Sequence, residues 1–211
     1  MVAPKDYDHN VFVNCPFDRP YRRLFRAIVF AVIDCGFIPR CALEVSDSSL
    51  DRVRKLLNLM NDCRLGIHDI SRTQLDSASR LPRFNMPLEL GMFLGAKHFG
   101  TQEQKRKNCV IVDTKPYRYQ KFISDIAGKD IKAHGNDVAK TIKVVRDWLA
   151  SYSKALIPGA RKMRDKHMLF LQQLGHQCKA VHLTLGELTF MDFKLLAEEW
   201  LAKYDEEFKD I

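Results

Sequence analysis

The sequence has no long hydrophobic run and no paired-cysteine motif. Its longest apolar stretch, residues 27–33, is far shorter than the roughly 20 residues that span a bilayer. Its six cysteines are scattered without a CxxC pair, which favours reduced thiols over a disulfide scaffold or a zinc site. Residues 1–6 lack the pattern of a signal peptide. These absences predict a cytoplasmic protein without a membrane association.

Motifs for metals and for bound cofactors are also missing. The seven histidines are dispersed without an HExxH spacing, so we expect no metal site. Neither GxGxxG nor GxxxxGKS/T occurs, so neither a dinucleotide-binding Rossmann fingerprint nor a P-loop is supported. We expect no cofactor, and a nucleotide would be a substrate or ligand.

Composition and charge indicate a globular protein with a basic body. Of the 211 residues, 46% are hydrophobic and 28% are charged, which allows a sizeable core. The net charge is +8, but residues 185–211 carry −5 and the remainder therefore carries +13. A basic body attracts nucleic acid or anionic nucleotides. Alternatively, the acidic C-terminal helix docks on that body.

Strand-like and helix-like patterns alternate over the first 157 residues. Strands are predicted at residues 11–15, 37–43, 64–70, 108–113 and 131–134, with helices at 21–35, 46–62, 86–99, 122–127 and 136–152 and polar loops at 71–83 and 102–107. This order predicts an α/β fold with a flavodoxin-like open parallel sheet of about five strands flanked by helices. Pro39 places the second strand nearer an edge. Residues 1–157 would form this α/β domain and residues 158–211 a C-terminal helical extension.

Apolar spacing within the helices predicts which faces pack inward. The expected buried stripes are Leu24, Ile28, Ala31 and Val32; Leu50, Val53, Leu57 and Met60; and Leu88, Met92 and Ala96.

The extension is expected to contain a glycine-bearing link and a terminal helix over residues 187–208. Thr184 and Glu187 predict a capping box for that helix. Its stripe of Phe193, Leu196, Trp200, Tyr204 and Phe208 packs on its own domain or mediates dimerisation.

Polar residues follow the predicted strands, where open parallel sheets bind ligands. Small polar and acidic side chains suit ribose hydroxyls, and Arg83, together with Arg80, suits phosphate. The predicted substrate-binding residues are Asn14, Phe17, Asp18, Asp47, Asp69, Ser71, Arg83 and Asn85.

Glu89 is the predicted catalytic residue. Asn85 is a candidate N-cap, Pro87 is tolerated at a helix start, and Glu89 would follow in the first turn. A carboxylate beside Gly91 suits close approach of a sugar, and we expect it to face an open cleft. Alternatively, Glu89 only complements the helix dipole.

Three short motifs occur in the order and spacing of a known superfamily. Residues 13–17 (VNCPF) are similar to the strand-end A-x-P-F of nucleoside 2-deoxyribosyltransferase-like proteins, and residues 63–71 (CRLGIHDIS) resemble their third strand with its acidic end. Residues 87–91 (PLELG) resemble their E-L-G helix, whose glutamate is the nucleophile that holds the sugar. Toll/interleukin receptor (TIR) domains that hydrolyse NAD, and bacterial TIR-like nucleotide-binding proteins associated with phage defence, share this layout. The resemblance covers residues 11–150.

The resemblance implies that Glu89 acts in cleavage of an N-glycosidic bond. Asp69 and Asn85 would orient the ribose, and Phe17 would stack on the leaving ring. Transferases commonly carry an aspartate and a glycine just before the glutamate, whereas this chain has a segment with Arg83 and Asn85. A phosphorylated or dinucleotide substrate is therefore expected rather than base exchange. A homo-oligomer or an activating protein partner is also implied.

Three functions remain open at this stage. The first is hydrolysis of NAD or a related nucleotide, with Glu89 stabilising or trapping the ribosyl cation. The second is a non-catalytic nucleotide-sensing module that uses the same cleft to signal to a partner. The third, nucleic-acid binding by the basic body, ranks last because no interleaved aromatic and basic stripe is present.

Overall fold

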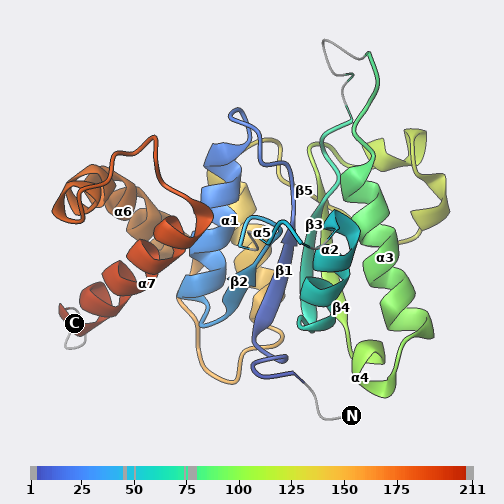
Figure 1. Cartoon of the computed structure of the whole chain (residues 1–211), viewed down its shortest axis with the longest axis horizontal. Coiled ribbons are helices and arrows are strands. Elements are labelled where there is room, and N and C mark those ends of the chain that lie inside the picture. Colours follow the sequence, from blue (N-terminus) through green and yellow to red (C-terminus); the bar gives the residue numbers. More distant parts are fainter. Residues whose placement is uncertain (1–3, 45–46, 50, 74, 76–79, 208–211) are drawn as a thin grey trace.

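The protein folds around one parallel sheet, as a computed structural model shows for residues 4–44, 47–49, 51–73, 75 and 80–207. The sheet has five strands in the order β2-β1-β3-β4-β5, and helices cover both of its faces (Figure 1). The strands are β1 (Asn10–Asn14), β2 (Ile38–Arg40), β3 (Leu65–Asp69), β4 (Asn108–Asp113) and β5 (Lys132–Ala133). This strand order is the flavodoxin-like one, so the predicted fold class is confirmed.

Burial along the strands follows from their place in the sheet. Every residue of β1 and β3 is buried, because central strands of a parallel sheet are covered on both faces. β2 lies at an edge, as its proline predicts, since Pro39 has no N–H to donate to a further strand.

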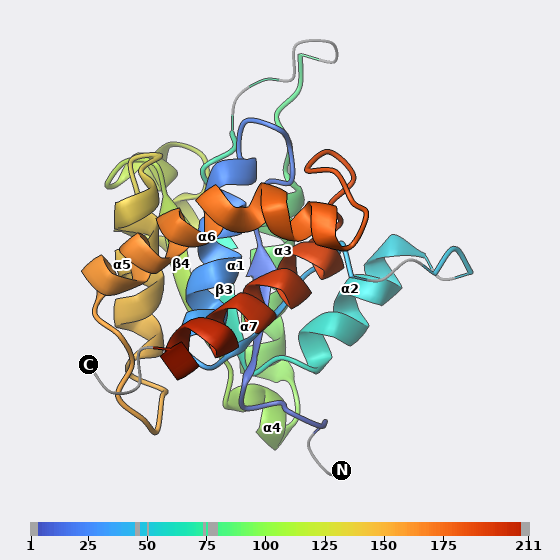
Figure 2. The same ribbon diagram turned by 90° about the vertical axis from the view of Figure 1, so that its left-hand side faces the viewer.

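The helices form layers on either side of the sheet (Figure 1). One face carries α1 and α5, and the other carries α2 and α3. Figure 2 shows α6 and α7 crossing outside α1. The bounds are α1 (Arg22–Asp34), α2 (Arg52–Asn61), α3 (Asn85–Phe99), α4 (Gln102–Lys105), α5 (Val138–Leu149), α6 (Ala160–Ala180) and α7 (Phe190–Glu207). Because α1 lies between the sheet and α6–α7, most of its residues are buried, including the predicted stripe.

The helical extension shares one hydrophobic core with the sheet. The ring of Phe30 on α1 lies 5.4 Å from that of Phe170 on α6 and 6.1 Å from that of Trp200 on α7. The buried Lys166 ammonium of α6 pairs with Asp34 at 2.8 Å and with Asp205 at 2.9 Å. An apolar contact and a buried ion pair therefore join α6 and α7 to α1.

The predicted buried stripe of α2 was wrong. On α2 the buried residues are Leu56, Leu59 and Met60, whereas Val53 and Leu57 are about half exposed. Leu50 lies outside the described residues. The α2 cap is Asp51, which accepts a hydrogen bond from the Arg54 N–H at 2.8 Å.

The loop predicted at residues 102–107 contains the short helix α4, and its last residue is buried. The Lys107 ammonium donates to the main-chain oxygens of Met60 and Cys63 and lies 4.6 Å from the centroid of the Phe93 ring. Burial lowers the pKa of Lys107 to about 8. The predicted helix at 122–127 is instead a pair of 3-10 turns, Arg118–Lys121 and Ser124–Ile126.

In the extension, the glycine-bearing link was wrong, because α6 continues through Gly175. The Thr184–Glu187 box forms locally, with Thr184 donating from its N–H to Glu187 at 2.8 Å, but α7 begins later. Thr189 caps α7 by accepting from the Asp192 N–H at 3.2 Å. Phe208 lies outside the described residues.

Candidate functional site

The strand order reverses between β1 and β3, and α3 begins over this point. Asn14, the last residue of β1, donates from Nδ2 to the Met86 main-chain oxygen at 2.9 Å. The same Nδ2 lies 3.0 Å from Nδ1 of His68 on β3, and both side chains are buried. Asn14 therefore fixes the first turn of α3 over the switch point, where doubly wound folds bind ligands.

Glu89 lies one turn further along α3, on the face turned toward the sheet. Its neighbours on that face are the buried residues Met86, Leu90 and Phe93, spaced as one helical stripe. Only 8% of Glu89 is exposed, so its carboxylate does not face an open cleft as expected. Burial raises the pKa of Glu89 to about 7, and the nearby Arg52 opposes this only in part. Within the described residues, no hydrogen bond reaches the carboxylate.

The predicted inward face of α3 was therefore wrong. Leu88 is 56% exposed and Met92 and Ala96 are half-buried, whereas the stripe of Glu89 is packed. The helix is apolar on most of its surface, so apolar spacing did not single out one face. Asn85 is the first helical residue and not the cap, because Phe84 holds that position without a side-chain cap. Glu89 consequently begins the second turn, beyond the free N–H groups that a dipole-complementing glutamate would approach.

A second carboxylate, that of Asp69, ends β3. Like Glu89, it lies near the thiol of Cys15. Burial raises the pKa of the Cys15 thiol well above its usual range, and the charges of Asp69 and Glu89 raise it further. Both carboxylates therefore lie around the end of β1. A raised pKa disfavours the thiolate, so Cys15 is not the nucleophile that we consider.

Asp69 accepts two hydrogen bonds and lies beside a buried histidine. The Tyr21 hydroxyl donates to Oδ2, the Ser71 N–H donates to Oδ1 at 2.7 Å, and His134 Nε2 lies 3.0 Å from Oδ2. His134 Nδ1 accepts from the Asn136 N–H at 3.0 Å, so Nε2 is the ring nitrogen that faces Asp69. Burial and the Asp69 charge raise the pKa of Tyr21 well above its usual value. Asp69 thus ties the end of β3 to α1 and to the residue after β5.

A third buried carboxylate, Asp113, ends β4. Its Oδ1 accepts from Arg118 Nε at 2.8 Å and from the Thr114 N–H at 2.6 Å, while Oδ2 has no partner among the described residues. Arg118 also donates to the Ser71 main-chain oxygen at 2.8 Å and to Thr73 Oγ1 at 2.5 Å. Arg118 thereby connects the segments that follow β3 and β4.

Sequence reasoning missed Tyr21, His134, Asp113 and Arg118. The signal for two of them was present: Asp113 ends β4 and His134 follows β5, so the strand-end rule applied to both. Tyr21 and Arg118 lie in a helix start and a 3-10 turn, for which spacing carried no indication.

The remaining predicted residues divide between this edge and the surface. Asp18 pairs with Arg72 at 2.9 Å, which links the ends of β1 and β3. The Phe17 ring packs edge-on against Phe25 at 5.2 Å, so it is part of the core surroundings. Asp47 is exposed and accepts from the Ser49 N–H at 2.8 Å, away from this cluster.

Arg83 and Asn85 are exposed at the beginning of α3, and Arg80 is exposed before it. The α3 cap has no side-chain acceptor, and Pro87 has no N–H. Positive side chains and free helix N–H groups therefore gather one turn before Glu89, as in anion sites at helix N-termini.

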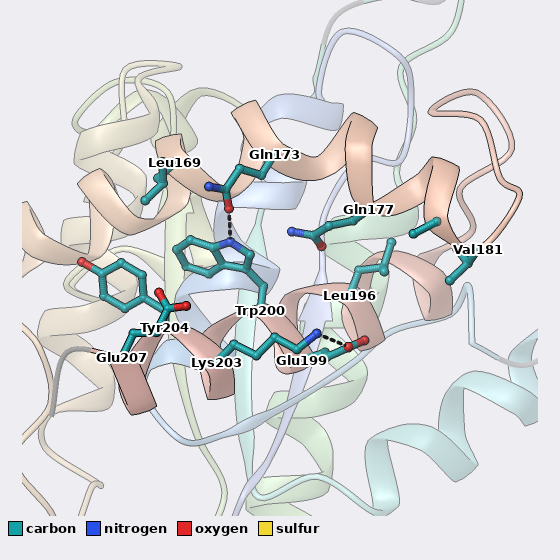
Figure 3. A pocket seen from close by; sticks show the side chains of 11 residues that line it. Leu169, Gln173, Gln177, Val181, Leu196, Glu199, Trp200, Lys203, Tyr204 and Glu207 are labelled. Atoms are coloured by element: carbon teal, nitrogen blue, oxygen red, sulfur yellow. Dashed lines mark hydrogen bonds and ion pairs between the residues drawn. The ribbon is translucent and has the colours of Figure 1, made fainter.

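Three cavities lined by described residues lie away from this edge. One of about 500 Å³ lies between α6 and α7, where Trp200 donates to Gln173 Oε1 at 2.6 Å (Figure 3). One of about 880 Å³ lies beside β4, and one of about 650 Å³ lies near the start of β1.

No family model matches the chain, and no curated protein or solved structure matches it at a significant level. Across the described ranges, His, Cys, Asp and Glu side chains form no group of three or more suited to a metal ion. Likewise, none of the helices described above combines the length and the apolar character needed to cross a membrane. The features that bear on function are the parallel sheet and the buried Glu89 beside its switch point.

Proposed function

We propose that the protein is a TIR/deoxyribosyltransferase-like hydrolase that cleaves the N-glycosidic bond of NAD or a related nucleotide, with Glu89 as its catalytic residue. The observation that carries this proposal is the position of Glu89: a nearly buried carboxylate, without a hydrogen-bond donor in the described structure, beside the switch point of the sheet. Burying a carboxylate without a partner opposes folding, and such groups occur most often at functional sites.

Cleavage of the N-glycosidic bond of NAD uses a carboxylate close to ribose C1′. When the bond between ribose C1′ and the nicotinamide nitrogen breaks, its electron pair stays on the nitrogen and neutralises the ring. The positive charge moves to the ribosyl C1′, where a carboxylate in a dry site stabilises it or forms a bond with it. Water then adds at C1′ and releases a proton. No general acid is needed, because the leaving group departs as a neutral ring.

The surrounding residues position the site in this proposal. Asn14 fixes the start of α3, and Asp69 with Tyr21 and His134 fixes the ends of the neighbouring strands. The exposed Arg83, beside the open N–H groups of α3, would hold the phosphates of the nucleotide. Since only 8% of Glu89 is exposed, a ribose can reach its carboxylate only if α3 moves when the substrate binds.

The test is nicotinamide release from NAD, measured by chromatography together with calorimetric NAD binding. The wild type should release nicotinamide, and Glu89→Gln should bind NAD but lose at least about 100-fold in rate. Glu198→Gln, at a partly exposed glutamate of α7, is the matched control and should keep full activity. Circular dichroism confirms that each variant is folded.

The same two measurements, nicotinamide release and NAD binding, distinguish a hydrolase from a non-catalytic nucleotide sensor. Saturable NAD binding without turnover, unchanged in Glu89→Gln, would identify a sensor. Full activity in Glu89→Gln would exclude the catalytic role. A panel of other nucleosides and nucleotides in the same assay identifies the preferred substrate. Repeating the assay over a range of protein concentrations tests activation by homo-oligomers, and adding a candidate protein from phage defence tests activation by a partner.

A further inference from the structure

A groove runs along the part of the β4 edge that has no paired strand. β5 pairs only with the last two residues of β4, Val112 with Lys132 and Asp113 with Ala133. The remaining edge of β4, from Asn108 to Ile111, lines a groove of about 880 Å³, with α3 on one side and α5 on the other.

Main-chain groups of β4 face this groove. The Asn108 N–H donates to Arg64 and the Val112 oxygen accepts from Ile70, each at 3.0 Å, so these residues point their main-chain groups toward β3. Because successive residues alternate, Cys109 and Ile111 point theirs toward the opposite edge. In the described part of the chain, no strand pairs with β4 before Val112. The N–H and C=O of Cys109 and the N–H of Ile111 are therefore open to an added strand.

The rim of the groove is strongly positive. Five lysines and two aspartates line it: Lys97, Lys129, Lys132, Lys140, Lys143, Asp130 and Asp147. The aspartates pair with Lys132 and Lys143, and Lys97 donates to Asn108 Oδ1 at 2.9 Å. The exposed Lys129 and Lys140 have no carboxylate partner among the residues described, so a net charge of about +3 remains to meet an anionic partner.

The walls are apolar. Leu94 of α3 lies on one side, and Val144 and Trp148 of α5 lie on the other. Trp148 packs edge-on against Tyr152, with ring centroids 5.5 Å apart. Such a surface accepts aliphatic side chains, while the lysines accept carboxylates.

We propose that this groove binds an extended acidic peptide segment of a partner protein, which adds to the sheet as a strand beside β4. Main-chain hydrogen bonds to Cys109 and Ile111 would supply part of the affinity. Apolar side chains of the peptide would contact Trp148 and Val144, and its carboxylates would pair with Lys129 and Lys140. This site is separate from Glu89 and does not depend on NAD cleavage.

The experiment uses fluorescence anisotropy with the whole protein and a labelled peptide of about eight residues that alternates glutamate and valine. We expect saturable binding with a dissociation constant of about 0.1 mM or tighter, weakened by salt. The double variant Lys129→Glu, Lys140→Glu should weaken binding at least about 10-fold. Lys203→Glu, on the exposed face of α7, is a control charge reversal away from the groove and should leave binding unchanged. Circular dichroism and thermal unfolding report whether each variant is folded.

Two control peptides test the mode of binding. A peptide with lysine in place of glutamate should not bind. A peptide N-methylated at every valine and every glutamate should lose most of its affinity, because neither of its edges can pair with β4. Equal binding of the N-methylated peptide would overturn the proposal. So would displacement of the peptide by NAD or inorganic phosphate at the same lysines, or no saturable binding at about 1 mM peptide.

Discussion

At the scale of single residues, the main feature is polar side chains buried at a cost to stability. Glu89 and His167 are both buried residues. Both ring nitrogens of His167 are buried without a partner among the described residues, and no described residue donates a hydrogen bond to the Glu89 carboxylate. They differ in position: Glu89 lies at the switch point of the sheet, whereas His167 lies on α6 with its ring 5.2 Å from that of Phe30. We assign function to Glu89 and only a packing role to His167.

Glu89→Gln should stabilise the protein above neutral pH. The folded-state pKa of Glu89 is raised from 4.5 to about 7, so the folded state binds more protons than the unfolded state between these values. Stability contributed by the neutral carboxyl is complete below pH 4.5 and is lost as the pH rises through 7. We expect Glu89→Gln to raise the free energy of unfolding by about 2 kcal/mol at pH 8 and to leave it unchanged near pH 4. Urea unfolding at both pH values measures this, and an equal effect at both would contradict it.

His167→Leu should also stabilise the protein, but with the opposite pH dependence. Burial lowers the pKa of His167 to about 4, with Arg26 contributing, so the unfolded state binds the proton more readily between pH 4 and 6.5. We expect a gain of about 1 kcal/mol at pH 7, from removing unpaired ring nitrogens, that grows on acidification. His176→Leu, at an exposed position of the same helix, is the control. Thermal unfolding of both variants at pH 7 and pH 5 checks the result, and a destabilised His167→Leu would be inconsistent with it.

At the scale of elements, sequence patterns predicted which segments form strands and helices better than which faces they bury. The strand Asn108–Asp113 and the stripe of α1 follow directly from apolar patterning. The faces of α2 and α3 do not, because apolar residues occupy both sides of each helix and tertiary contacts decide between them. The same limit applies to the site: Glu89 was identified from its motif, but its burial depends on the face of α3 that meets β1 and β3.

Two glycine substitutions test the packing of β3 and α3. A Cβ at Gly66 would lie 2.8 Å from His68 Nε2 and 2.9 Å from Phe93 Cζ, so Gly66→Ala should lower the free energy of unfolding by about 1–3 kcal/mol. A Cβ at Gly91, inside α3, would meet no atom within 4 Å, so Gly91→Ala should raise it by about 0.5–1 kcal/mol. Chemical denaturation compares the pair. Equal effects of the two substitutions would refute this description of the interface.

At the scale of the whole molecule, α6 and α7 complete the core. Phe30 contacts both helices, Phe25 lies 5.9 Å from Phe190, and Lys166 neutralises the buried Asp34. The change in composition predicted a boundary at residue 157 between the α/β domain and the extension. At this point the chain turns back across α1. Composition marks such a change in pattern, but it does not report which surfaces pack together.

A chain that ends after Ile157 should therefore not fold as a stable monomer. Removing α6 and α7 would expose the outer face of α1 and leave Asp34 without its cation, a loss of several kcal/mol. We expect aggregation or no cooperative thermal transition, measured by size exclusion with light scattering and by calorimetry. A soluble monomer with a sharp transition would show instead that residues 158–211 are an independent unit.

The most direct measurement is the initial rate of nicotinamide release from NAD as a function of pH, for the wild type and for Glu89→Gln. A buried carboxylate that must be ionised to stabilise the ribosyl cation predicts a wild-type rate that rises with pH through about 7 and a Glu89→Gln rate at background throughout. A wild-type rate that does not change between pH 5 and 8, or a Glu89→Gln variant as active as the wild type, would contradict the account.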